Sequence, residues 1–147
     1  MPFDSLIPDA NYFATRAITI EAPPDLVWPL VIDLSALPAG TIIRRAEEKR
    51  TVVFAPPEVE AEATWVVVLE PRGNATRLVS RNRARFPSRL RAVLRYLFVD
   101  PGQFLFERDW MLSVKARAEA VASRAASGES GLATLHSPRN SQPATRH

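Results

Sequence analysis

The segment PGQFLFERDWMLSVKARAEAVASR, residues 101–124, decides the fold expected for this chain. Proline and glycine interrupt the preceding run, and no helix breaker follows, so the pattern predicts a long helix from Gln103 to Arg124. At about 100° per residue, its apolar side chains fall on one stripe: Phe104, Trp110, Met111, Val114, Ala118 and Val121. Glu107 falls near the centre of this stripe, which makes it the most informative ionisable residue of the helix.

A carboxylate on an apolar helix face is costly to bury unless it is paired, or unless the face lines a cavity. In the first case Glu107 forms a structural ion pair with an arginine on a facing strand, or reaches the rim of the domain. In the second case it faces a cavity, where burial would raise its pKa and it would orient a ligand or exchange a proton. The helix pattern alone leaves both interpretations open.

Length and composition indicate one domain with a hydrophobic core. We expect residues 1–12 to be an N-terminal extension, residues 13–125 to form the domain, and residues 126–147, rich in proline and small polar residues, to be a disordered tail. No secretory pattern and no apolar run of membrane-spanning length is found, which predicts a cytoplasmic protein. The chain has no cysteine, so disulfides, a thiolate nucleophile and a cysteine metal site are excluded.

The first elements expected are a strand and a short helix. Phe13–Glu21 alternates in polarity and places Arg16 on the same face as Ile18 and Ile20, a pattern typical of a strand. The proline pair that follows suits the first turn of a helix, and Pro29 should keep that helix short or kinked.

The middle of the chain predicts antiparallel strands. Thr41–Arg45 and Arg50–Ala55 form a hairpin pattern, Ala63–Glu70 is apolar on both faces like a central covered strand, and Gly73 with its asparagine neighbour makes the turn into Ala75–Phe86. Strands followed by a long helix predict an α+β fold.

Charge is distributed unevenly along the chain. Residues 71–99 contain eight arginines and no acidic residue, although the net charge of the whole chain is only +3. Candidates for contact with an anionic surface are Arg81, Arg83, Arg85, Arg89, Arg91 and Arg95. A solvated strand face and a covering helical turn over residues 87–99 would explain the same arginines. Nucleic acid is disfavoured as the partner, because aromatic residues are rare within the stripe and no known reading motif is present.

Three segments carry a resemblance to a known family: TRAITIEAPPDLVWPL (15–30), ATWVVVLEPRGNATRLVSRNRAR (63–85) and GQFLFERDWMLSVKARAE (102–119). In this order they resemble the START/polyketide-cyclase-like (SRPBCC) superfamily. The resemblance implies a helix-grip fold, in which a curved antiparallel sheet grips a long C-terminal helix and a short helix follows the first strand. Only residues 31–40 lie between the first helix and the middle strands, where such proteins usually have a longer segment. We therefore expect the domain to be shortened, or incomplete, at this point.

The resemblance also implies binding of a hydrophobic or amphipathic small molecule, lipid- or polyketide-like, in a cavity between the sheet and the last helix. The residues expected to bind it are Trp28, Trp65, Asn82, Phe104, Glu107, Trp110, Met111 and Val114. Each large apolar residue among them would serve equally well as ordinary core.

Two other functions remain open. One is an aromatase/cyclase-like enzyme on polyketide-type substrates, with Glu107 as a weak candidate for general acid or base. The other is a peripheral module that contacts anionic membranes or a partner through the Arg-rich segment. The histidines, His136 and His147, lie in the tail, so no Ser-His-Asp arrangement is predicted within the domain. No metal-ligand spacing or phosphate loop is present, and no metal or cofactor is expected.

Overall fold

The computed structural model describes residues 9–55, 62–85, 88, 90, 93 and 100–134 of the chain. Its elements are β1 (Tyr12–Ile20), α1 (Pro24–Val31), the 3-10 helix η1 (Leu34–Ala36), β2 (Ile42–Glu47), β3 (Thr51–Ala55), β4 (Glu62–Arg72), β5 (Ala75–Arg85) and α3 (Asp100–Thr134). Every strand expected from the sequence is present, and no strand end differs from its expected position by more than two residues.

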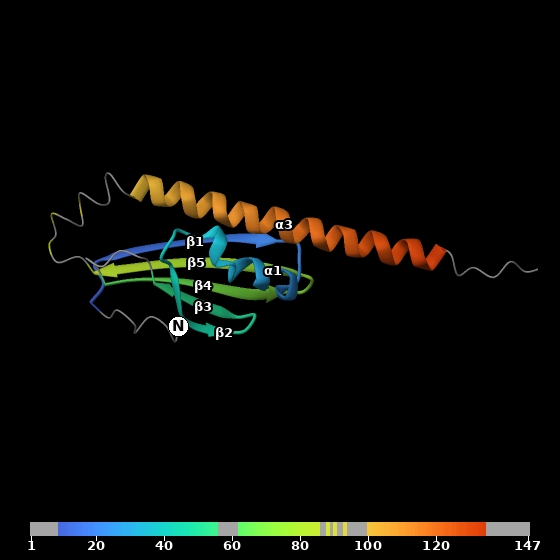
Figure 1. Ribbon diagram of the computed structural model, residues 1–147, viewed down its shortest axis with the longest axis horizontal. Coiled ribbons are helices and arrows are strands. Elements are labelled where there is room, and N and C mark those ends of the chain that lie inside the picture. Colours follow the sequence, from blue (N-terminus) through green and yellow to red (C-terminus); the bar gives the residue numbers. More distant parts are fainter. Residues whose placement is uncertain are drawn as a thin grey trace, which may run out of the picture.

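The five strands form one antiparallel sheet in the order β1-β5-β4-β3-β2 (Figure 1). The first strand therefore pairs with the last, and the central position falls to β4, as its apolar pattern predicts. Register places Arg16 opposite Ser80, and Trp65 opposite Asn82. Because side chains alternate between faces, these four residues share one face of the sheet, here called the inner face.

Both helices lie on the inner face, and α3 packs against α1 and β1. The core between the layers joins residues from every part of the chain: Ile20, Ala22, Val27, Trp28, Val31, Leu37, Val52, Phe54, Val67, Leu69, Leu78, Trp110, Met111, Val114 and Ala118. The α+β helix-grip architecture expected from the sequence is confirmed.

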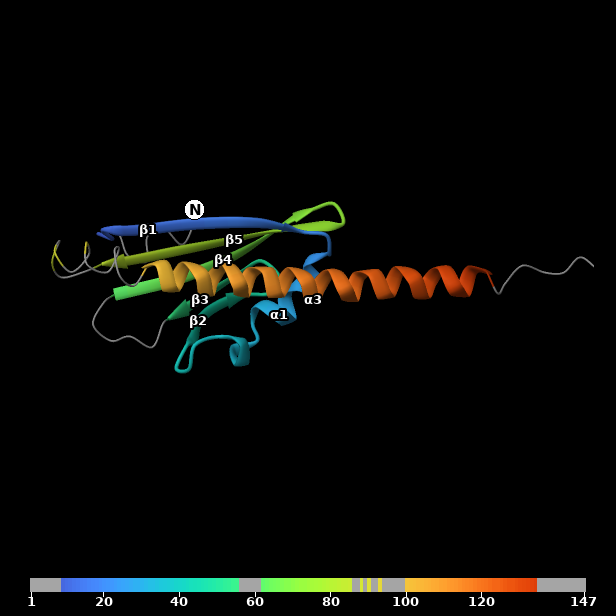
Figure 2. The ribbon, with the colours of Figure 1, turned by 90° about the horizontal axis from the view of Figure 1, so that it is seen from above.

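The helix α3 is longer than the sheet that it covers. Its 35 residues span about 52 Å at 1.5 Å per residue, whereas an 11-residue strand such as β4 spans about 36 Å. The C-terminal part of α3 therefore projects past the sheet (Figure 2). Val121, expected on the buried stripe, is 44% exposed, whereas Ala118 and Ala122 on either side of it contact the core.

The expected bounds of the last helix were wrong at both ends. The helix begins at Asp100, so the Pro-Gly pair lies inside its first turn, where proline is tolerated because its missing N–H needs no partner. It continues past Arg124 to Thr134, into the region expected to be a disordered tail. Residues 135–147 lie outside the described residues, as does most of the helical turn expected over 87–99.

Few of the described elements cover the sheet near its β2 edge, which lies opposite the β1 edge. Between α1 and β2 the chain contains only η1, and all six residues of the edge strand β2 are exposed. Ile42 is 57% exposed and Ile43 is 36% exposed.

Candidate functional site

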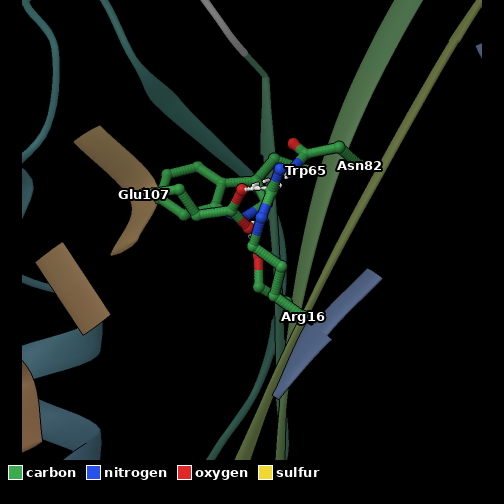
Figure 3. Close-up of polar contacts among 5 residues, drawn as sticks. Arg16, Trp65, Asn82 and Glu107 are labelled. Carbon is green, nitrogen blue, oxygen red and sulfur yellow. Dashed lines mark hydrogen bonds and ion pairs between the residues drawn. The ribbon is translucent and has the colours of Figure 1, made fainter. Parts of the chain in front are cut away.

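A buried polar cluster lies between the sheet and α3, centred on Glu107 (Figure 3). The Glu107 side chain is only 3% exposed. Its Oε2 accepts a hydrogen bond from Arg16 Nη1, and its Oε1 accepts one from the hydroxyl of Ser80. The amide Nδ2 of Asn82 lies 3.2 Å from both carboxylate oxygens. Both oxygens are therefore already engaged by donors, one of them cationic.

The geometry of the strands explains why these donors converge. Arg16 of β1 and Ser80 of β5 are cross-strand partners, and Asn82 follows two residues later on the same face. Glu107 approaches them from the first third of α3. The ion pair with Arg16 supplies the charge that compensates burial of the carboxylate, as the structural interpretation of the helix pattern requires.

Aromatic rings lie directly beside the cluster. Trp65 Nε1 donates to the Ser80 hydroxyl at 2.7 Å. The Trp65 ring contacts Trp110 edge-on and Phe54 at a tilt, with centroids 5.0 Å apart in each pair. A continuous aromatic row therefore runs from β3 through β4 to α3, and its middle member is hydrogen-bonded into the polar cluster.

One donor in this region has no acceptor. Trp110 is 5% exposed, and its Nε1 has no hydrogen-bond partner among the described residues. A buried N–H without an acceptor costs about 1–3 kcal/mol, so such groups are rare in proteins and each needs an explanation.

The remaining ligand-binding candidates separate into two groups. Trp28, Met111 and Val114 belong to the packed core. Phe104 is 42% exposed, outside the buried stripe where the helix pattern placed it. Its ring lies under the Arg16 guanidinium at 4.6 Å, at the margin of the Glu107 cluster.

Sequence reasoning missed two members of the cluster, Arg16 and Ser80. A signal for Arg16 was present, because it shares its strand face with Ile18 and Ile20, and an arginine on an apolar face needs an acidic partner. Nothing local distinguishes Ser80 from any other small polar residue in a strand. Asn82 was assigned correctly to the inner face, where it is buried.

A second polar tie holds α3 to the end of β1. Lys115 Nζ donates to the carbonyl of Thr19 at 2.7 Å and to Glu119 Oε1 at 2.6 Å. The backbone N–H of Glu21 donates to the same Glu119 oxygen at 2.8 Å. The hydrogen bond from Lys115, followed by that from Glu21, lowers the pKa of Glu119 below its ordinary value.

The arginines of β5 project from the outer face, away from α3. Arg83 stacks on the Phe13 ring at 4.9 Å, Arg85 lies 3.9 Å from Asp9, and Arg77 lies 4.0 Å from Glu70. The outer face also holds Val66 and Val79, which are buried. It is therefore less uniformly solvent-exposed than the sequence predicts. Arg81 belongs to the same row, whereas Arg89, Arg91 and Arg95 lie outside the described residues.

The described residues also line an open groove of about 540 Å³ at the β1 edge, formed by Ala17, Ile18, Thr19, Arg72 and Arg77. It is separate from the Glu107 cluster. Within the described part of the chain, no group of histidine, cysteine and acidic side chains could hold a metal ion. Of the helices described, none is long and apolar enough to cross a membrane.

Solved structures with this fold include proteins from several bacteria. TTHA0849 from Thermus thermophilus superimposes with a TM-score of 0.54 at 15% identity, over 75% of this chain and 99% of that one. The Mll3558 protein from Rhizobium loti gives a TM-score of 0.53 at 15% identity, over 72% and 96%. No family model and no curated protein matches the chain.

A further similar structure is the di-domain ARO/CYC StfQ from the steffimycin biosynthetic pathway. The TM-score is 0.57 at 12% identity, and the match covers 82% of this chain and 55% of StfQ. At such identities the likeness concerns the fold alone. The helix-grip fold is thus common to this chain and to an aromatase/cyclase.

Proposed function

We propose that the protein binds an apolar or amphipathic small molecule between the sheet and α3, and that the polar end of this ligand is a hydrogen-bond acceptor such as a carbonyl. The observation that carries the proposal is the buried Nε1 of Trp110, which lacks an acceptor among the described residues. Membership of the START/polyketide-cyclase-like superfamily, suggested by the sequence resemblance and compatible with the fold, is part of the same proposal.

The chemistry of the cluster favours an acceptor over a donor as the ligand's polar group. Glu107 is the strongest acceptor in the region, but Arg16, Ser80 and Asn82 already occupy it. A ligand hydroxyl or amine would have to displace one of these donors. A carbonyl would instead accept from Trp110 without breaking any existing hydrogen bond, and would relieve an unsatisfied donor.

The aromatic row offers the path for the apolar part. Ile43 of the exposed strand β2 pairs with Phe54, and Phe54 leads through Trp65 to Trp110. Entry at the thinly covered β2 edge would lay the apolar chain along these rings, with its carbonyl at Trp110. Flat aromatic and aliphatic walls with few polar groups are typical of small-molecule sites.

In this account Glu107 is a positioning residue. It holds Ser80, and through Ser80 it fixes the Trp65 ring against Trp110. A carboxylate engaged on both oxygens is poorly placed to take a proton from a substrate, since a general base needs a free lone pair within reach of the reacting group.

An aromatase/cyclase-like activity is the second candidate, favoured by the fold likeness to StfQ. Its substrate, a poly-β-keto chain, would carry carbonyl acceptors of the kind that the Trp110 N–H can bind. Cyclisation would then depend on the shape of the aromatic row and on carbonyl polarisation by Trp110, without Glu107 as the base. Turnover of a poly-β-keto mimic, absent in Trp110→Phe, would support this activity.

The test is displacement of an environment-sensitive apolar dye by paired compounds, each a long-chain ketone and the alkane of the same length. We expect the ketone to bind more tightly and to raise the melting temperature. Trp110→Phe should remove that advantage, about 2- to 12-fold for one hydrogen bond, while the alkane is unaffected. Equal binding of ketone and alkane to the unmodified protein would contradict the proposal.

A further inference from the structure

We propose that two copies of the chain associate edge to edge, with β1 of one copy pairing antiparallel with β1 of the other. β1 lies at one edge of the sheet, and β5 is its neighbouring strand (Figure 1). The pairing uses Phe13–Ala17, here called the open edge segment. The inference does not depend on a ligand bound at Trp110.

Contacts with α3 show which backbone groups of β1 point away from β5. Side chains of α3 bind the carbonyl of Thr19 and the N–H of Glu21. In an antiparallel pair, alternate residues turn both backbone groups toward the partner strand or away from it. Phe13, Thr15 and Ala17 therefore also turn theirs away from β5, and no hydrogen bond of the described residues engages these outward groups.

The open edge segment lacks the features that usually protect an edge strand, which are charged side chains, proline or a bulge. The opposite edge strand, β2, has a register shift after Ile43 and charged side chains at half of its six positions. In the open edge segment the register with β5 is unbroken. Its one charged residue, Arg16, points to the inner face and binds Glu107. An edge of this kind is suited to the addition of a further strand.

The sequence of the open edge segment is complementary to itself in one antiparallel register. In this register Thr15 of one copy lies opposite Thr15 of the other, on the two-fold axis. Phe13 then falls opposite Ala17, and on the inner face Ala14 falls opposite Arg16. Each large side chain therefore faces a small one, and like charges do not meet within the segment. This self-complementarity favours a second copy as the occupant, and the two-fold contact closes at a dimer.

Other registers fit the edge less well. Moving the axis one or two residues toward the N-terminus would require the N–H of Asn11, which donates to the carbonyl of Ala84 at 3.1 Å. Moving it one residue toward the C-terminus would place Arg16 opposite its own copy. Moving it two residues in that direction would require backbone groups that α3 already binds.

The register centred on Thr15 also places an aromatic ring beside an open groove. The groove of about 540 Å³ at the β1 edge is lined in part by Ala17, Thr19 and Arg77. Phe13 lies on the same outer face as Ala17 and is 59% exposed. In the pair, each Phe13 ring would lie opposite Ala17 of the other copy and enter the groove there. Burial of two aromatic side chains would stabilise the dimer.

The charges around the segment are compatible with this arrangement. Arg16 keeps its ion pair with Glu107, because Ala14 of the second copy leaves the arginine room on the inner face. At the ends of the pairing, Asp9 of one copy would approach Glu21 of the other. Arg85 lies 3.9 Å from Asp9 and offsets that charge.

Sedimentation velocity of the full chain over a series of concentrations tests the pairing. We expect a dimer that dissociates on dilution. Thr15→Lys and Thr15→Glu each place like charges face to face on the two-fold axis, and each should weaken self-association about tenfold or more. An equal mixture of these two variants brings opposite charges together and should restore the dimer. That rescue is specific to pairing between two copies in this register.

The matched control is Ala46→Lys, which adds the same charge to the other edge strand, β2, and should dimerise like the unmodified chain. If circular dichroism shows that a Thr15 variant is misfolded, Thr15→Pro replaces it, because proline is tolerated in an edge strand where the N–H points outward. An unmodified chain that stays monomeric at every concentration would overturn the proposal. Dimerisation that the Thr15 variants leave intact would do so too, as would a mixture that fails to restore it.

Discussion

Arg16 and Glu107 lie 91 residues apart in the sequence and form an ion pair that joins the edge strand β1 to α3. Their side chains are 22% and 3% exposed, so the pair is largely withdrawn from water. Removing one partner of such a pair leaves an uncompensated charge in the interior, which costs more than the intact pair contributes.

Replacement of Glu107 by glutamine should therefore destabilise the fold. The amide NH₂ would face the donors of Arg16, Ser80 or Asn82 whichever way it turns, and the arginine would lose its counter-charge. We expect a decrease of about 2–4 kcal/mol in the free energy of unfolding, measured by urea denaturation. Glu48→Gln, in the exposed β2–β3 turn, is the control and should change little. An unaltered urea midpoint for Glu107→Gln would show that the carboxylate is not held by this network.

Ser80 links the polar cluster to the aromatic row, so Ser80→Ala should affect both. The variant removes the acceptor of Trp65 Nε1 and one donor to Glu107. We predict a loss of about 1–3 kcal/mol, together with a change in the near-ultraviolet circular dichroism of the tryptophans. Ser127→Ala, which removes an exposed hydroxyl on the projecting part of α3, is the matched control. Identical spectra for Ser80→Ala and the wild type would argue against the Trp65–Ser80 contact.

The contact between Glu119 and Lys115 should make stability depend on pH. The folded-state pKa of Glu119 is lowered. The contribution of its carboxylate to the stability of the fold is therefore complete at neutral pH, above the ordinary carboxyl range. This contribution is lost as pH falls from the ordinary carboxyl pKa, around 4, to the lowered pKa of the folded state. The stability difference between wild type and Glu119→Gln should therefore be largest at neutral pH and shrink in acid. Urea denaturation at several pH values measures it, and a difference that stays constant with pH would contradict the assigned contact.

The local patterns of the sequence predicted the elements well because they depend on residues close together. Alternation identified the face of β1 that carries Arg16, Ile18 and Ile20, and the apolar stripe identified the face of α3 that carries Trp110, Met111 and Val114. The ends of α3 were harder, since Pro101 and Gly102 are breakers in a helix interior but tolerable in a first turn. Val121 fits the stripe and is nevertheless exposed, although Ala122 beside it packs against the core.

The site could be predicted only in part. The position of Glu107 on an apolar helix face predicts that its carboxylate is paired. Which residue pairs with it, Arg16, depends on the antiparallel pairing of β1 with β5. That pairing also brings Ser80 and Asn82 to the same carboxylate. A local sequence pattern does not reveal which residues two strands place opposite each other. It also does not distinguish Trp65, whose N–H has an acceptor, from Trp110, whose N–H has none among the described residues.

The most direct test of the account follows the indole N–H signals of the three tryptophans by ¹⁵N-edited NMR, assigned with Trp110→Phe. We predict that a long-chain ketone moves the Trp110 signal downfield in a saturable titration, as its proton gains an acceptor. The Trp65 signal, already bonded to Ser80, should move much less, and the matching alkane should leave the Trp110 proton in place. A Trp110 signal that no carbonyl compound shifts, in a protein that remains folded, would contradict the proposal that this buried donor receives a ligand.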